Sequence, residues 1–132
     1  MNIIKKAYCR AFQFCFWAVY PLLPYREPEL VENGLEGLSS VIKKENKHHP
    51  LVVTDQGVKK VGLLDKVTSV LDERNIVYSV YSDVVANPTT ENVEKALIKY
   101  KEEGCDSIIA IGGGSSIDTA KALGARVANP KK

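Results

Sequence analysis

The chain has 132 residues, which is enough for one domain of ordinary size and too few for two. Hydrophobic residues make up 45% of it and charged residues 26%, a composition that excludes intrinsic disorder and collagen-like repeats. Lysine and arginine total 18 against 16 acidic residues, which leaves a net charge of +2. Because nucleic-acid binding usually requires a clustered basic face, we expect no nucleic-acid partner.

The cysteines and histidines exclude two further kinds of site. Three cysteines without a Cys-x-x-Cys pair are a poor disulfide framework, which favours reduced thiols and a cytoplasmic protein. His48 and His49 are adjacent, so they lack the i, i+4 spacing with which two imidazoles share a metal on one helix. We therefore expect a solvated loop at residues 45–50 and no metal site built from this chain.

The first 24 residues form an aromatic-rich N-terminal segment, in which Lys5, Lys6 and Arg10 precede an apolar run. A basic start before an apolar run is typical of a signal peptide. The run at 11–24 is too short to span a bilayer, which takes about 20 apolar residues, and no small-x-small cleavage pattern follows it. The sequence therefore favours a helix that ends at Pro21 and docks on the body of a larger protein, over a signal peptide or membrane anchor. We expect no membrane partner.

The chain then alternates between helical and strand periods. Leucine, valine and isoleucine recur at helical spacing between residues 30 and 42, which predicts a first helix. A short β-branched run at 51–54 predicts a buried strand, which ends in the turn Asp55-Gln56-Gly57. A single helix is expected to follow and to close near Asn75, with these residues along one face: Val58, Val61, Leu64, Val67 and Leu71.

The rest of the chain repeats this alternation. A second strand is expected at 76–81, followed by a helix that opens at Pro88-Thr89 and stops at Gly104. A third strand is expected at 107–111 and a third helix from about 115 to 128. Three strand–helix units in alternation predict an α/β fold with a doubly wound, Rossmann-like parallel sheet. Ligands of such sheets bind outside the carboxyl ends of the strands.

Three glycines follow the third strand, in Gly112-Gly113-Gly114-Ser115-Ser116-Ile117-Asp118. Glycines let the backbone approach a ligand closely, and the free N–H groups of the following helix point to the same place. Two or three hydrogen bonds to a charged group, each about 1.5–3 kcal/mol, would exceed a helix-dipole contribution of about 0.3–1 kcal/mol. Ser115 and Asp118 also have the spacing of a capping box, which needs no ligand. Because a capping box does not require three successive glycines, the pattern favours a phosphate or pyrophosphate site.

Two well-known glycine-loop motifs do not fit this stretch. No lysine follows at the P-loop position, and Ile117 stands where the Gly-x-Gly-x-x-Gly fingerprint needs Gly or Ala. That fingerprint also follows the first strand, whereas this loop follows the third. The candidate acid, Asp55, comes after the first strand, where its carboxylate could accept both ribose hydroxyls of an adenosine and would repel a 2′-phosphate. This favours NAD over NADP, the alternative being that Asp55 is only a turn residue.

These motifs together resemble a known family. Residues 111–124 resemble the Gly-Gly-Gly-Ser-x-x-Asp-x-x-Lys signature of the iron-containing alcohol dehydrogenases, and residues 53–57 and 87–89 resemble that family's first- and second-strand turns. The resemblance implies an NAD(P)-binding domain at 25–132, incomplete, after an N-terminal extension at 1–24. It implies that Asp55 holds the adenosine ribose and that Asn87 lies beside the cofactor. It also implies that the other cofactor-binding residues are Gly57, Gly113, Gly114, Ser115, Ser116 and Asp118.

Members of this family carry a second, all-helical domain, which binds a divalent metal (iron or zinc) through one aspartate and three histidines. The resemblance therefore implies hydride transfer between a small alcohol or aldehyde and a nicotinamide cofactor, with the metal polarising the substrate oxygen. This sequence stops before any such domain, and its two histidines match no ligand position. We expect the chain to be an enzyme only by resemblance and inactive alone, with no catalytic or metal-binding residue of its own. It is then either a fragment of a homo-oligomeric dehydrogenase or a short protein that works with a separate metal-binding half.

Two other interpretations stay open. One is a relative that resembles glycerol dehydrogenase or dehydroquinate synthase. The other is a non-enzymatic module that binds a nucleotide or phosphate, or that docks on a partner through its aromatic N-terminus. A three-stranded sheet also leaves a parallel edge and one face uncovered, so we expect the chain to be marginally stable or to self-associate.

Overall fold

The computed structural model describes residues 10–15, 18–19, 30–31 and 34–130. The chain divides into two units, residues 1–30 and 31–132. In the first unit, residues 10–15 and 18–19 are helical, and the side chains of Phe12 and Phe14 are exposed. The predicted helix end at Pro21 and the predicted boundary between residues 24 and 25 lie outside the described residues. Within the described part, no helix is long and apolar enough to cross a membrane.

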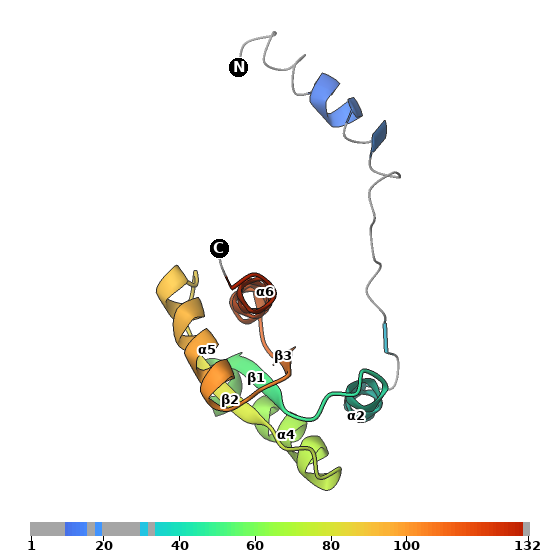
Figure 1. The fold of residues 1–132 in the computed structure, drawn as a ribbon, viewed down its shortest axis with the longest axis vertical. Helices are drawn as coiled ribbons and strands as arrows, with labels where there is room; N and C mark the ends of the chain where they lie inside the picture. Colours follow the sequence, from blue (N-terminus) through green and yellow to red (C-terminus); the bar gives the residue numbers. More distant parts are fainter. Residues whose placement is uncertain (1–9, 16–17, 20–29, 32–33, 131–132) are drawn as a thin grey trace. The chain divides into compact units, whose positions relative to one another are not determined.

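The second unit is built on a parallel three-stranded sheet (Figure 1). Its strands are β1 (Pro50–Asp55), β2 (Ser79–Val84) and β3 (Ser107–Ala110), in the order β2-β1-β3. The central strand β1 is fully buried along most of its length, as expected of a strand covered on both faces. Leu51 pairs with Ser79 on one side and with Ile108 on the other.

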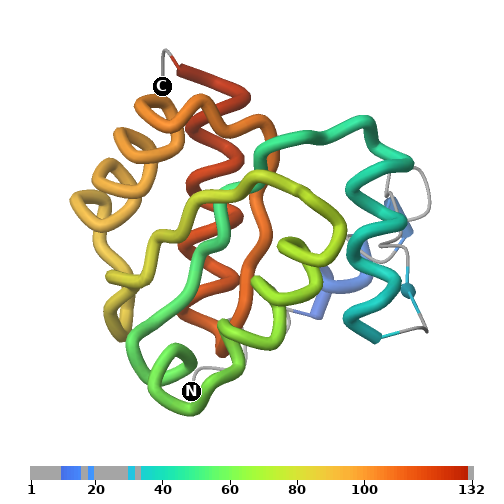
Figure 2. Tube along the Cα trace, turned by 90° about the horizontal axis from the view of Figure 1, so that it is seen from below, coloured from blue at the N-terminus to red at the C-terminus, as the bar shows by residue number. Residues whose placement is uncertain are grey.

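Helices cover both faces of this sheet. The helices are α2 (Gly34–Lys44), α3 (Gln56–Lys60), α4 (Leu63–Glu73), α5 (Thr90–Glu102) and α6 (Gly114–Ala128). Figure 2 shows α5 and α6 on one side of the strands and α2 and α4 on the other. The predicted doubly wound α/β architecture is therefore confirmed.

Side chains along β1 alternate between two hydrophobic cores, because successive residues of a strand point to opposite faces. On the α5–α6 side, Leu51 and Val53 pack with Tyr81, Val84, Val93, Ala96, Leu97, Cys105 and Leu123. On the α2–α4 side, Val52 packs with Ile42, Leu64 and Leu71. This two-sided burial holds β1 in place and fixes where its carboxyl end, Asp55, emerges.

The predicted single helix from Val58 to Asn75 is wrong. It is two helices, α3 and α4, because Gly62 has a φ of 75°, a left-handed conformation that interrupts the helical path. Val61, expected on the apolar face, is 70% exposed at this break.

The predicted bounds of two other elements also differ from the structure. The second strand is three residues later than the predicted 76–81, because the N–H of Ile76 still bonds the carbonyl of Leu71 at the end of α4. The first predicted helix begins only at Gly34, and Leu30 lies outside it with 88% of its surface exposed.

Candidate functional site

A pocket opens at the edge of the sheet where the parallel strands end. Its volume is about 330 Å³. Residues from the turn after β1, the end of β2 and the start of α6 line it: Asp55, Gln56, Gly57, Val84, Val85, Ala86 and Ser115. This is the edge at which open α/β sheets bind their ligands, as the sequence predicts.

The start of α6 presents backbone N–H groups at this edge. Gly113 is the N-cap residue, and no side chain caps the helix. The first N–H to bond within the helix is that of Ile117, which donates to the Gly113 carbonyl at 3.2 Å. The N–H groups of Gly114 and Ser115 precede that bond at the start of the helix, so they are geometrically free to meet an anion.

The capping box that the spacing of Ser115 and Asp118 offers as the alternative to a phosphate site does not form. The helix begins at Gly114, so Ser115 already lies inside the first turn and cannot act as the N-cap residue. Asp118 is exposed on the helix surface. This removes the interpretation of the glycine loop in which the chain itself satisfies the helix start.

Asp55 is a turn residue, one of the two alternatives that the sequence leaves open, and its carboxylate also lies on the pocket wall. Its Oδ1 accepts a hydrogen bond from the N–H of Val58 at 3.0 Å, so Asp55 caps α3 as a turn residue does. Its Oδ2 accepts from the hydroxyl of Ser116 at 3.2 Å. The same carboxylate lines the pocket, and each oxygen has a second lone pair for a ligand hydroxyl.

A buried network fixes the end of β2 beside the pocket. The amide Nδ2 of Asn92 donates to the Tyr81 hydroxyl at 2.9 Å and to the Asp83 carbonyl at 2.8 Å. The Tyr81 hydroxyl donates to the Asn92 carbonyl at 3.1 Å. Burial, assisted by the nearby charge of Asp83, raises the pKa of Tyr81, so its hydroxyl keeps its proton and remains a donor. The network ties β2 to the first turn of α5.

Two further contacts position the loops around the pocket. The side chain of Gln56 donates to Ser82 Oγ at 3.1 Å and to Asp83 Oδ1 at 3.2 Å, which joins the start of α3 to the end of β2. Thr89 caps α5 by accepting from the N–H of Asn92 at 3.3 Å. These contacts hold the pocket rim with side-chain bonds from both neighbouring turns.

Three of the eight predicted site residues line the pocket and five do not. Asp55, Gly57 and Ser115 line the pocket, whereas Asn87 does not; it is exposed in the loop after β2 with a φ of 53°. Gly113, Gly114 and Asp118 lie exposed at the start of α6, and Ser116 is fully buried behind Asp55.

Sequence reasoning missed four lining residues, Gln56, Val84, Val85 and Ala86. The last three were missed because the second strand was expected to end at residue 81, before the polar pair Ser82-Asp83. Gln56 could have been predicted, because it directly follows Asp55 in the turn at the end of β1.

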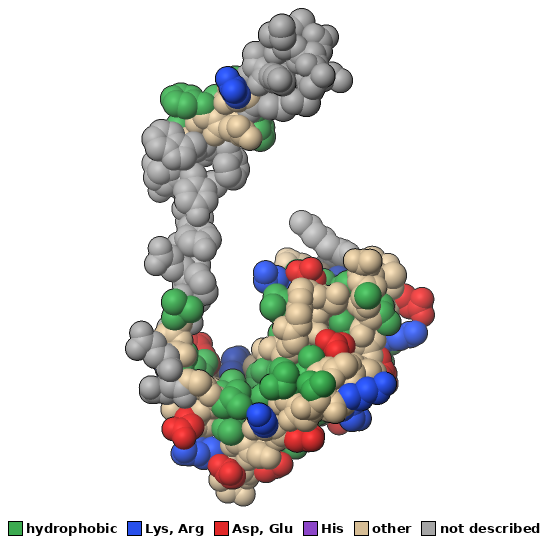
Figure 3. Space-filling view, turned by 180° about the vertical axis from the view of Figure 1, so that it is seen from behind, with side chains coloured by type: hydrophobic (Ala, Val, Ile, Leu, Met, Phe, Trp, Pro, Cys, Tyr) green, Lys and Arg blue, Asp and Glu red, His purple; other side chains and the backbone are tan. Residues whose placement is uncertain are grey.

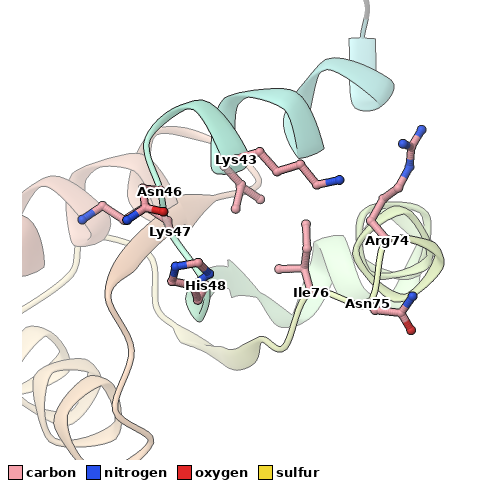
Figure 4. Close-up of a pocket in the computed structure, with 8 residues that line it drawn as sticks. Lys43, Asn46, Lys47, His48, Arg74, Asn75 and Ile76 are labelled. Atoms are coloured by element: carbon pink, nitrogen blue, oxygen red, sulfur yellow. The ribbon is translucent and has the colours of Figure 1, made fainter.

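A second pocket lies at the opposite edge, where the strands begin (Figure 4). Its volume is about 340 Å³, and its lining includes Lys43, Lys47 and Arg74. Lys43 lies in the last turn of α2 and Arg74 is the C-cap residue of α4, where cations offset the helix dipole without any ligand.

The histidine loop lies at the same edge. His48 is exposed, as expected of a solvated loop, but His49 is half-buried, with its Nε2 at 2.9 Å from Ser79 Oγ. Within the described ranges, no group of three or more His, Cys, Asp or Glu side chains is placed to hold a metal ion.

Comparison with known proteins points in one direction. Residues 30–132 match the family model described as iron-containing alcohol dehydrogenase. The chain is 44% identical over 91 residues to alcohol dehydrogenase 4 of Schizosaccharomyces pombe, covering 69% of the chain and 22% of that protein. It is 37% identical over 94 residues to lactaldehyde reductase of Escherichia coli K12, covering 71% of the chain and 25% of that protein.

Solved structures agree with these sequence matches. A 1,3-propanediol oxidoreductase superposes with a TM-score of 0.69 at 32% identity, over 72% of this chain and 25% of that one. An NADH-dependent butanol dehydrogenase A from Thermotoga maritima superposes with a TM-score of 0.70 at 27% identity, over 80% and 27%. The chain therefore spans about a quarter of the length of the relatives it matches.

Proposed function

Since the chain belongs to the iron-containing alcohol dehydrogenase family, we propose that it is the nucleotide-binding part of an NAD-dependent alcohol or aldehyde oxidoreductase. The observation that carries this proposal is the uncapped start of α6 beside the Asp55 carboxylate, at the carboxyl edge of the sheet. One relative is named as NADH-dependent, which supports the choice of cofactor.

The residues present fit a dinucleotide. A pyrophosphate needs donors, and the N–H groups at the start of α6 are exposed beside Gly113 and Gly114, where an added Cβ would meet no atom within 4 Å. A ribose needs an acceptor for its two hydroxyls, and Asp55 supplies one on the pocket wall. The apolar side chains of Val84 and Val85 offer a surface for a ring.

Each residue then has a distinct role. The backbone of Gly113, Gly114 and Ser115 binds the pyrophosphate, and Asp55 binds the adenosine ribose and disfavours a 2′-phosphate. Gly57 and Asn87 border the cofactor, and we assign Asp118, one turn into α6, to the same side. When bound, the nicotinamide supplies the hydride-transfer chemistry. The small alcohol or aldehyde substrate, and homo-oligomer formation by the whole enzyme, belong to the same proposal.

The test is a calorimetric titration of NAD and NADP into the wild-type chain and into Asp55→Asn. Asparagine can still accept from the Val58 N–H, so α3 keeps its cap while the charge is lost. We expect saturable NAD binding that weakens about tenfold or more in the variant, because a hydrogen bond to a charged group contributes roughly 1.5–3 kcal/mol. The difference between the NAD and NADP affinities should also become smaller in the variant, because the charge that repels a 2′-phosphate is gone.

The control is Asp72→Asn, which removes the same charge from an exposed position at the end of α4. It should titrate as wild type does. Absence of NAD binding to a chain shown by circular dichroism to be folded would contradict the proposal.

A second candidate function is nucleotide binding without turnover. It rests on the same uncapped start of α6 and the same Asp55 carboxylate, which would bind a nucleotide whether or not a reaction follows. We propose that residues 1–132 do not oxidise alcohols on their own, so the absorbance of NADH should not rise when NAD, an alcohol and ferrous or zinc ions are added.

A cytoplasmic location is also proposed, supported by the free thiols of Cys15 and Cys105.

A further inference from the structure

Ser116 links the glycine loop to Asp55 from behind the pocket. It lies in the first turn of α6 but is fully buried, with 0% of its surface exposed. Its hydroxyl donates to Asp55 Oδ2 at 3.2 Å, across 61 residues of sequence. The contact joins the loop after β3 to the turn after β1, the two segments that form the proposed nucleotide site.

The Asp55 carboxylate is enclosed on the sides away from the pocket. Its Oδ1 is held by the Val58 N–H at 3.0 Å, and a Cβ at Gly57 would come within 2.9 Å of that oxygen. A Cβ at Gly112 would come within 3.1 Å of Oδ2 and 2.8 Å of Ser116 Oγ. The carboxylate therefore fits only because both neighbours are glycines, and among the residues that the structure describes Ser116 is the side chain that donates to Oδ2.

Ser116 is too deep to touch a ligand itself. Its exposed fraction is zero, whereas Asp55 is part-exposed and lines the pocket. Any effect of the Ser116 hydroxyl on a bound nucleotide must therefore pass through Asp55. A fixed acceptor loses less conformational freedom on binding than a mobile one, so holding the carboxylate in one orientation strengthens ribose binding.

We propose that Ser116 is a positioning residue, which orients the Asp55 carboxylate toward the ribose and thereby sets the preference for NAD over NADP. This rests on the proposed function, because it assigns Asp55 to the ribose. Ser116 would then influence cofactor preference although it does not line the pocket.

The experiment measures NAD and NADP affinities by calorimetry for wild type, Ser116→Ala, Asp55→Ala and the double variant. Ser116→Ala should weaken NAD about threefold to tenfold, the effect of one lost hydrogen bond, and should bring the NAD and NADP affinities closer together. In the Asp55→Ala background the same change should have no further effect, because the partner through which it acts is absent.

Two further variants guard the interpretation. Ser39→Ala removes another buried serine hydroxyl, which donates to the Glu36 carbonyl within α2 on the other face of the sheet, and it should leave both affinities unchanged. Ser116→Cys replaces the hydroxyl with a somewhat larger thiol that is only a weak donor, so it should weaken NAD as Ser116→Ala does, even if the alanine variant does not fold.

The outcomes separate this inference from the function on which it rests. If Asp55→Ala weakens NAD but both Ser116 variants bind as Ser39→Ala does, the positioning role is wrong and the nucleotide site stands. If Ser116→Ala weakens NAD by the same factor with and without Asp55, the hydroxyl does not act through that carboxylate, and the inference is again overturned. A folded wild-type chain that binds neither nucleotide overturns both.

Discussion

At position 112 both the backbone conformation and the surrounding atoms require glycine. Its φ of 134° lies in a region that side-chain-bearing residues rarely adopt. A Cβ there would also lie 2.8 Å from Ser116 Oγ and 3.2 Å from Val58 Cγ2. Of the three successive glycines, this first one is required by conformation and by space at once, whereas a Cβ at Gly113 or Gly114 would meet nothing within 4 Å.

Gly112→Ala should therefore lower the free energy of unfolding by about 3 kcal/mol, the combined cost of backbone strain and overpacking. Urea denaturation followed by circular dichroism measures this. The matched control is Gly124→Ala within α6, where the nearest atom, Ile108 Cδ1, is 3.9 Å from the new Cβ. That variant should be neutral or more stable by up to about 1 kcal/mol, because alanine favours the helix. Equal stabilities of the two variants would show that Gly112 is not constrained.

Single residues of the candidate site could be predicted from the sequence only where a polar residue or a glycine directly follows a predicted strand. Asp55 and the glycine loop each follow a β-branched run that predicts a strand, so their place at one edge of the sheet follows from the sequence pattern. The bond between Asp55 and Ser116 spans 61 residues, and no local pattern contains it. For the same reason the burial of Ser116 could not be foreseen from a motif that places it next to the exposed loop.

At the scale of elements, Asp106 joins the loop before β1 to the start of β3. Its carboxylate accepts the N–H of His48 at 2.7 Å, the N–H of His49 at 3.1 Å and the hydroxyl of Ser107 at 2.8 Å. Partial burial tends to raise the pKa of Asp106, but the bonds from His48, Ser107 and His49 outweigh it and hold the pKa below its usual range. The ionised carboxylate thus holds the amino ends of two neighbouring strands together.

Because the pKa of Asp106 is lower in the folded state, its contribution to stability is present above the unfolded pKa of about 3.9 and is lost as the pH falls through the folded value. Asp106→Asn should lower the free energy of unfolding at pH 7 by about 1–3 kcal/mol. The difference from wild type should shrink below about pH 4. Denaturation curves at several pH values measure both effects. A difference that is constant down to pH 2 would exclude the ionised carboxylate as its source.

The elements were predicted best where hydrophobic periodicity and a terminal signal agree. Thr89 and Gly104 bracket α5, and the structure ends that helix within two residues of each. The apolar residues from Val58 to Leu71 have helical spacing, but Gly62 adopts a left-handed conformation and divides the segment into two helices. The sequence does not predict this break, because the φ of a single glycine cannot be derived from the apolar pattern around it. The second strand was placed three residues early because the apolar Ile76 and Val77 precede it in the turn after α4.

At the scale of the whole second unit, the sheet has an open side. Among the described strands, β3 pairs with β1 alone, so its other edge offers unpaired backbone groups. Beside that edge lies a groove of about 410 Å³ with a mostly apolar lining, which comes mainly from α2 and from β3 with the residue after it, and includes Leu35, Leu38, Val41, Ile109 and Ile111. Figure 3 shows hydrophobic side chains gathered on this unit's surface.

An open parallel edge next to an apolar groove favours association, because pairing satisfies the backbone groups and burial removes the groove from water. The 132-residue chain should therefore shift from monomer toward larger species as its concentration rises, measured by sedimentation velocity.

Leu35→Glu places a charge in the groove at a residue that is already 41% exposed, and it should move the transition to higher concentration. Val61→Glu adds the same charge at a 70% exposed valine between α3 and α4, outside the groove, and should not. A wild-type chain that stays monomeric at every concentration and melts cooperatively would show that the edge and groove are tolerated in water, and that three strands with helices on both faces suffice for a stable fold.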